Sequence, residues 1–204
     1  MRNLKRALSL ALAAIMLVGM MVVSASAASY NNLTDKDEIV NKDAVSMLVS
    51  LGIIEGKPDG SYGPTENVDR AQMAKMLSVI MNKGVDNSAL YQSVNSGLTD
   101  ITSHWAKGHI NYCYTTGIIA GRGNGKFDPS ATVTALEAAK MLLVALGYNA
   151  DTEGFVGNAW ATNVNVVASQ KGLYEGLESM DTPAALTRDN AAQMVWNAMN
   201  AYEV

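Results

Sequence analysis

The sequence predicts an all-α protein built from three helix-loop-helix repeats that pack as a pseudo-threefold bundle. Residues 52–77 and 117–142 align without a gap and are identical at 11 of 26 positions. A third, worn copy follows, in which Trp160 stands twelve residues before a glycine, as Trp105 does in the second copy. Each copy has two apolar stretches at helical spacing, and a two-helix unit of this size cannot bury its apolar stripe alone. The copies should therefore pack around a shared axis, with at most short β-bridges in the loops.

The first 27 residues are typical of a signal peptide. Three basic residues within the first six positions precede an apolar run over 7–23, and Ala25-Ser26-Ala27 supplies small residues for cleavage. An uncleaved membrane anchor is the competing interpretation, because the run is nearly long enough to span a bilayer. We expect export, a mature chain that begins near Ala28, and no membrane span after cleavage.

Charge and cysteine content limit the possible partners of the mature chain, which we divide into repeats at 28–87, 88–148 and 149–204. Without the leader, the chain carries 12 basic and 19 acidic side chains, a net charge of −7. This balance argues against nucleic acid and anionic lipid as partners. Cys113, the one cysteine, cannot form an internal disulfide and has the spacing of a buried apolar residue.

The first helix of each repeat is predicted from apolar residues at helical spacing and from the glycine that ends it. Gly52, Gly117 and Gly172 occupy the position where a helix commonly ends with a positive φ. The apolar positions before these glycines are Val40, Ala44, Met47, Leu48 and Leu51 in the first repeat, Trp105, Ile110 and Cys113 in the second, and Trp160, Val164, Val167 and Ala168 in the third.

The loop between the two helices contains Gly-Arg-Gly-Asn-Gly over 121–125 in the second repeat. A phosphate cradle needs inward backbone N–H groups, but the middle glycine aligns with Pro58, which has none. A calcium loop fails as well, because Lys57 and Arg122 fall where a carboxylate should coordinate. Both copies instead carry a turn dipeptide, Asp-Gly or Asn-Gly. We therefore expect tight turns and no cofactor, metal or catalytic residue.

The second helix of each repeat begins at an N-cap. Asp69 with Gln72, and Thr134 with Glu137, fit the capping box, whereas Thr187 keeps only the cap itself. Apolar residues follow at helical spacing: Met73, Met76, Leu77 and Ile80; Ala138, Met141, Leu142 and Ala145; and Ala191, Met194, Val195 and Met199.

These residues closely resemble the S-layer homology domain, over essentially all of the mature chain. The second repeat shows the family's pattern as Leu98-Thr-Asp100, His104-Trp105-Ala106, Gly117-Ile-Ile-Ala-Gly121, Gly125-Lys-Phe127-Asp-Pro129 and Thr134-Ala-Leu-Glu137. The resemblance implies three repeats with pseudo-threefold symmetry that hold an exported protein non-covalently to the bacterial cell surface. The implied ligand is a secondary cell-wall polysaccharide, often carrying pyruvate ketals, bound in grooves between neighbouring repeats.

The resemblance also implies which residues bind the polysaccharide. The family's arginine at the start of the second helix corresponds to Arg70 and Arg188 here. Its early aspartate, its tryptophan and its loop glycine correspond to Asp35 and Asp100, to Trp105 and Trp160, and to Gly56 and Gly121. The sequence departs from the pattern at four positions, so we expect at most two complete grooves: Ala135 replaces the arginine of the second repeat, Ile39 and Val40 replace His and Trp in the first, and Phe155 replaces the aspartate of the third.

Arg70 and Arg188 are also unusual on physical grounds, because each is a cation at the start of a predicted helix. A cation in the first helical turn opposes the helix macrodipole and costs up to about 1 kcal/mol. An anionic sugar carboxylate at this helix start would meet free N–H groups and a guanidinium. In the alternative interpretation, an exposed arginine simply solvates the helix end. Asp69, Thr134 and Thr187 are better explained as caps than as ligand contacts, and the two tryptophans could equally pack in the core or between repeats.

Three classes of function follow from these observations. The first is an anchoring module that binds cell-wall polysaccharide. The second is a structural subunit whose repeats assemble with other surface-layer subunits. The third is an enzyme such as a wall hydrolase, which is disfavoured because His104 and His109 lie five residues apart with no partnering Cys, Ser or carboxylate motif. A further alternative is that the chain is the anchoring end of a longer protein.

Overall fold

The computed structural model describes residues 29–201, and the signal peptide predicted at 1–27 lies outside them. The described part contains helices and only isolated β-bridges, which confirms the all-α prediction. Its α-helices are α2 (Lys42–Ser50), α3 (Arg70–Met81), α4 (Lys107–Thr115), α5 (Ala135–Ala145), α6 (Trp160–Gln170) and α7 (Arg188–Asn200), and its 3₁₀ helices are η1 (Tyr30–Asn32), η2 (Lys36–Glu38) and η3 (Ser88–Tyr91). No helix within 29–201 is long and apolar enough to cross a membrane.

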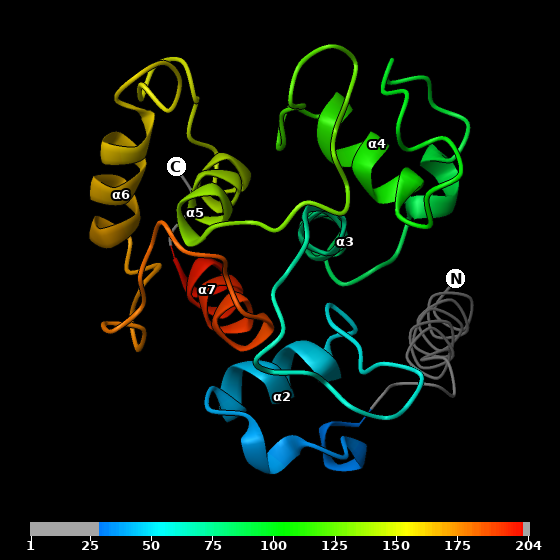
Figure 1. Cartoon of the computed structure of the whole chain (residues 1–204), viewed down its shortest axis with the longest axis vertical. Coiled ribbons are helices and arrows are strands. Elements are labelled where there is room, and N and C mark those ends of the chain that lie inside the picture. Colours follow the sequence, from blue (N-terminus) through cyan, green and yellow to red (C-terminus); the bar gives the residue numbers. More distant parts are fainter. Residues whose placement is uncertain (1–28, 202–204) are drawn as a thin grey trace, which may run out of the picture.

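The second helices of the repeats form the centre of the molecule. Figure 1 shows α3, α5 and α7 in the middle, with α2, α4 and α6 around them. Each outer helix packs on the central helix of the preceding repeat: α4 on α3, α6 on α5, and α2 on α7. The bundle is therefore a closed ring in which the first repeat packs on the third. Asp189 completes this contact, because its carboxylate accepts hydrogen bonds from the backbone N–H and the side-chain amide of Asn41.

A closed set of backbone hydrogen bonds lies on the pseudo-threefold axis. The N–H of Val68 donates to the carbonyl of Leu186 at 2.8 Å, and Leu186 donates to Val133 at 2.8 Å. Val133 in turn donates to Val68 at 2.9 Å, which closes the ring. These three residues precede the three central helices at equivalent positions. The symmetry inferred from the repeats thus extends to individual backbone hydrogen bonds.

The central helices begin with the predicted caps. The Asp69 carboxylate accepts the N–H of Gln72 at 2.7 Å, and Thr134 Oγ1 accepts the N–H of Glu137 at 3.2 Å. In both cases the return bond of the capping box is also present. Thr187 caps α7 without a return bond, as its sequence predicts. The caps fix where each central helix starts, and so place the residue that follows each cap.

The outer helices end as predicted, but the first one buries a different face. The glycines after α2, α4 and α6 have φ values of 68°, 79° and 70°. Cys113 is buried, as predicted, and burial raises the pKa of its thiol to about 12.

In α2, however, the buried face includes Ala44, Val45 and Leu48, whereas Met47 and Leu51 are exposed. Val40 precedes the helix and is 82% exposed. The predicted apolar stripe was therefore wrong at three of its five positions.

Candidate functional site: two grooves between the repeats

Two cavities bring six of the predicted site residues together. The first groove, of about 230 Å³, is lined by Gly56 and Lys75 of the first repeat, Trp105 of the second and Arg188 of the third. The second groove, of about 370 Å³, is lined by the equivalent Gly121, Lys140, Trp160 and Arg70. Each groove thus combines side chains from all three repeats, rather than from two neighbours. This arrangement follows from the ring, because Arg70 of the first repeat reaches the loop of the second, and Arg188 of the third reaches the loop of the first.

The two arginines contact their loops in the same way. Arg188 Nε donates to the carbonyl of Tyr62 at 2.8 Å, Nη2 donates to the carbonyl of Glu55 at 3.1 Å, and the guanidinium lies over the Tyr62 ring. Arg70 makes the same contacts with the next loop, donating from Nε to Phe127 O at 2.8 Å and from Nη2 to Ala120 O at 2.7 Å. Its guanidinium carbon lies 4.3 Å from the centre of the Phe127 ring. A guanidinium has five N–H donors, so three on each arginine have no acceptor among the described residues.

Arg70 differs from Arg188 in its burial. Only 3% of Arg70 is exposed, whereas Arg188 is partly exposed. Burial, together with the nearby charge of Arg122, lowers the pKa of Arg70 to about 10, so its side chain remains protonated at neutral pH. The interpretation of these arginines as exposed groups that solvate a helix end is therefore wrong for Arg70, which joins the first repeat to the second.

The expectation of free N–H groups at the start of these helices is also wrong. The N–H of Arg70 donates to the carbonyl of Ala131 at 3.0 Å, and the next N–H donates to the carbonyl of Pro129 at 3.0 Å. The first two N–H groups of α7 donate likewise to the carbonyls of Glu66 and Pro64. The third N–H of each helix is taken by its cap. An anion in the groove would therefore meet the guanidinium but not the helix end.

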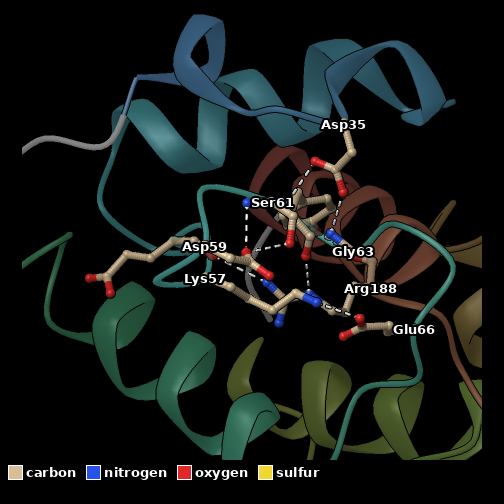
Figure 2. Close-up of polar contacts among 9 residues, drawn as sticks. Asp35, Lys57, Asp59, Ser61, Gly63, Glu66 and Arg188 are labelled. Carbon is tan, nitrogen blue, oxygen red and sulfur yellow. Dashed lines mark hydrogen bonds and ion pairs between the residues drawn. The ribbon is translucent and has the colours of Figure 1, made fainter.

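Asp35 and Asp100 hold the loops and are not among the residues that line either groove. The Asp35 carboxylate accepts the N–H groups of Tyr62 and Gly63, both at 2.7 Å, and Figure 2 shows it beside the loop that Arg188 contacts. Asp100 accepts the N–H of Phe127 at 2.9 Å and the next N–H at 2.7 Å. Burial acts to raise the pKa of both carboxyls, but these N–H bonds lower it below the usual value. The aspartates thus fix the carbonyls that receive the arginines.

Gly56 and Gly121 allow a close approach of the two arms of each loop. The residue after Gly56, Lys57, donates its N–H to Ser61 O at 2.7 Å, and Arg122 donates likewise to Lys126 O at 2.8 Å. A Cβ on Gly121 would lie 2.8 Å from the carbonyl oxygen of Lys126, and one on Gly56 would lie 3.3 Å from that of Ser61. Glycine is needed here to close the loop, and its open surface faces the groove.

Comparison with known proteins identifies the domain that contains these grooves. Residues 32–74 and 97–139 match the family model of the S-layer homology domain. The chain is an S-layer homology domain protein. The two matched segments each run from an early aspartate, Asp35 or Asp100, into the first turns of a central helix. The repeat boundaries at 87 and 148, and the assignment of residues 149–204 to this family, stay predictions.

Relatives of the chain carry names of the same kind. It is 31% identical to a cell surface protein of Thermoanaerobacter kivui over 87% of this chain and 22% of the relative. It is 33% identical to an S-layer protein of Bacillus licheniformis over 55% of this chain and 12% of the relative. An uncharacterized cell wall amidase of Bacillus anthracis is 27% identical over 70% of this chain. The chain spans about a quarter or less of the length of these three relatives. The family is one of exported cell-surface proteins.

Two lysines of the S-layer homology repeats line the grooves and were missed at the sequence level. Lys75 forms an ion pair with Glu55 at 3.0 Å, and Lys140 lies 5.7 Å from the centre of the Trp160 ring. In the second groove, Arg122 also pairs with Glu137 at 2.7 Å. The signal was present, since both lysines belong to the Ala-Lys-Met-Leu segment that the two copies share. The segment was interpreted only as helix core.

The third equivalent position lacks the groove's charged residues. Ala135 stands where the arginine would reach the loop of the third repeat, and it is fully buried. Gln193 occupies the position of the two lysines, and Val40 that of the two tryptophans. The arginine, the lysine and the tryptophan thus come together at two of the three equivalent positions, and the limit of two binding grooves stays a prediction.

His109 has partners that the sequence analysis did not find. Its Nδ1 lies 2.6 Å from Ser78 Oγ, and its Nε2 lies 3.8 Å from an Asp86 oxygen. This resembles the composition of a catalytic triad, but the hydroxyl of Ser78 donates to the carbonyl of Lys75 at 2.9 Å. While its proton is on that carbonyl, the serine oxygen can only accept from a protonated His109 Nδ1, the reverse of what a nucleophile requires. Ser78 and His109 are both buried between α3 and α4, so the cluster joins two repeats.

The His109 cluster should make stability depend on pH. Burial lowers the pKa of His109 below its ordinary 6.5, although Asp86 acts in the opposite direction. Below pH 6.5 the unfolded chain binds a proton that the folded chain takes up only at a lower pH, so stability falls as the pH falls. We expect urea midpoints to drop between pH 7.5 and pH 5, and to drop less in His109→Gln. His104→Gln is the control; if it flattened the profile equally, the assignment to His109 would be wrong.

Proposed function

We propose that the chain anchors an exported protein non-covalently to the bacterial cell wall by binding an acidic secondary cell-wall polysaccharide in the first and second grooves. The observation that carries the proposal is the composition of each groove, in which a guanidinium, a lysine and an indole ring from three repeats line one cavity. Membership of the S-layer homology family and the names of the relatives support a role at the cell surface.

The chemistry of the grooves favours an anionic sugar. Three basic side chains and one carboxylate line each groove, so each is cationic on a chain whose net charge is negative. A carboxylate, such as that of a pyruvate ketal, would accept from the arginine N–H donors that the loop carbonyls leave unused. Such charge-assisted bonds are about twice as strong as neutral ones. The exposed face of Trp105, which is 56% accessible, would pack against the sugar ring.

A sedimentation experiment tests the proposal. The exported chain should sediment with cell-wall sacculi, and it should stay in solution once the wall polysaccharide has been removed. Arg188→Ala should weaken sedimentation by about tenfold or more, because it removes a charge-assisted contact. Lys42→Ala, which removes an exposed cation that lines neither groove, is the matched control. Equal binding to intact and stripped sacculi would show that the polysaccharide is not the ligand.

Assembly with other surface-layer subunits is a second candidate function, favoured by an apolar hollow of about 210 Å³. The hollow lies where α3, α5 and α7 end, away from the helix starts that line the grooves, and Met81 and Met199 at its rim are exposed. Exposed apolar surface of this kind often marks a protein contact. Growth in particle size with concentration, together with absent wall binding, would favour assembly over anchoring. Neither candidate involves catalysis by this chain.

A further inference from the structure

Another cavity, larger than either groove, lies beside α7. It has a volume of about 770 Å³ and is lined by the end of α6, the loop at 172–176 and the outer side of α7. We call it the third pocket and define it by Lys171, Glu175, Gln193, Trp196 and Asn200. In the third pocket, Gly176 occupies the position of the groove glycine and Gln193 that of the groove lysine. The pocket then extends further along α7.

The third pocket has no net charge. Lys171 and Glu175 are its only charged lining residues among those the structure describes, whereas each groove has an excess of two positive charges. The arginine of the grooves is absent because Ala135 occupies its position. An anionic sugar would gain little here and would face the Glu175 carboxylate. The lining favours an uncharged ligand with both hydrogen-bond donors and acceptors.

Part of the pocket wall is held in place by hydrogen bonds. The amide nitrogen of Asn197 donates to the carbonyls of Leu173 at 3.1 Å and Glu175 at 2.9 Å, which fastens the loop to α7. Gln193 Nε2 donates to Asn197 Oδ1 at 2.8 Å, which fixes the orientation of both amides. A ligand would therefore meet a wall that is already ordered, and would lose less free energy on binding for that reason.

Several polar groups of this wall have no partner among the described residues. They are the side-chain oxygen of Gln193, the side-chain oxygen of Asn200 and the indole N–H of Trp196. Two acceptors and a donor beside an aromatic ring match the hydroxyl and acetamido groups of a sugar, whose C–H face packs on the ring. We propose that the third pocket binds a neutral N-acetylated oligosaccharide, separately from the acidic polymer assigned to the grooves. One chain would then contact two chemically different glycans.

Titration with a neutral probe tests this proposal. The tetramer of N-acetylglucosamine, added to the exported chain in a calorimeter or followed by tryptophan fluorescence, should bind once per chain. Trp196→Ala should weaken binding by about tenfold or more. Because Trp196 is partly buried and its removal could unfold the chain, Gln193→Ala is the second variant, and it should weaken binding while the melting temperature stays unchanged.

Matched variants separate the third pocket from the grooves. Trp105→Ala, in the first groove, should leave tetramer binding unchanged, whereas a loss there would place the tetramer in the groove and overturn the proposal. Absence of any binding at millimolar tetramer would overturn it as well. Failure of the wall-sedimentation test would not affect this result, because the neutral tetramer does not use the arginines. Likewise, Gln193→Ala should leave binding of an acidic oligosaccharide unchanged.

Discussion

Arg70→Ala will lower the free energy of unfolding by about 3 kcal/mol, far more than removal of an exposed helix-end arginine would. The substitution leaves the buried carbonyl of Phe127 without its donor, and a buried acceptor left unpaired costs about 1–3 kcal/mol. The substitution also removes the donor to the carbonyl of Ala120, an exposed residue whose oxygen can turn to water. It also removes the cation that lies over the Phe127 ring, worth about 1–2 kcal/mol when it is desolvated. Water entering from the groove offsets part of this loss. Urea denaturation of the variant measures it.

Arg188→Ala is the matched comparison for Arg70→Ala. Arg188 makes equivalent contacts with Tyr62 and Glu55, but it is partly exposed, so water can replace more of what is lost. We expect a loss of about 1 kcal/mol. Equal losses in the two variants would show that burial of Arg70 contributes nothing. The comparison also decides which arginine is suited to binding assays, since only Arg188 can be removed without a large loss of stability.

Ala135 shows how a repeat folds without this arginine. It begins α5 at the position equivalent to Arg70 and Arg188, and its N–H still donates to the carbonyl of Ala184. The loop that an arginine at 135 would contact is two residues shorter than the other two loops. The next N–H, that of Leu136, donates to the carbonyl of Thr182 at 3.1 Å, so the first two N–H groups of α5 contact this loop as those of α3 and α7 contact theirs. The arginine is therefore not required for the fold at this position, which is consistent with a binding role where it is retained.

The features that could be predicted from the sequence are those set by local chemistry. Helix starts at Asp69, Thr134 and Thr187 follow from capping groups three residues away, and the helix stops follow from glycines with positive φ. The repeat itself was visible because its copies keep these groups at equal spacing. Each of these predictions depends on a window of a few residues. The all-α architecture follows from adding such windows together.

The features that could not be predicted depend on contacts between distant repeats. Arg70 is held by two backbone carbonyls that lie 50 and 57 residues away, and every residue carries a carbonyl, so no residue type marks the acceptor. The N–H groups at the helix starts are occupied by the next repeat for the same reason. The pairing of His109 with Ser78 spans 31 residues and depends on α4 packing on α3. Helical periodicity shows which face of a helix is apolar, but it does not show which other helix packs on that face.

Disabling one groove will reduce the affinity of the chain for intact wall by about a hundredfold or more. For a short acidic oligosaccharide, the chain will lose only one of its two binding sites. Lys75→Glu and Lys140→Glu are matched variants, because the two lysines occupy the same position in the two grooves. Each reversal places a carboxylate against the acidic ligand. Titration with the oligosaccharide should change from two sites per chain to one in either variant, and to none when both are combined.

The difference between the two measurements follows from linkage within one chain. Once one groove has bound a polymer, the second meets nearby acidic units at a high effective concentration, and this raises overall binding by about 10²–10⁴ over one site alone. A short oligosaccharide cannot bridge the grooves and gains nothing. If one variant abolished wall binding and the other had no effect, only one groove would bind the wall. If both lost wall binding without a change in oligosaccharide stoichiometry, the lysines would act outside the grooves. The melting temperature of each variant serves as the control, and an unchanged value assigns the loss to the ligand contact.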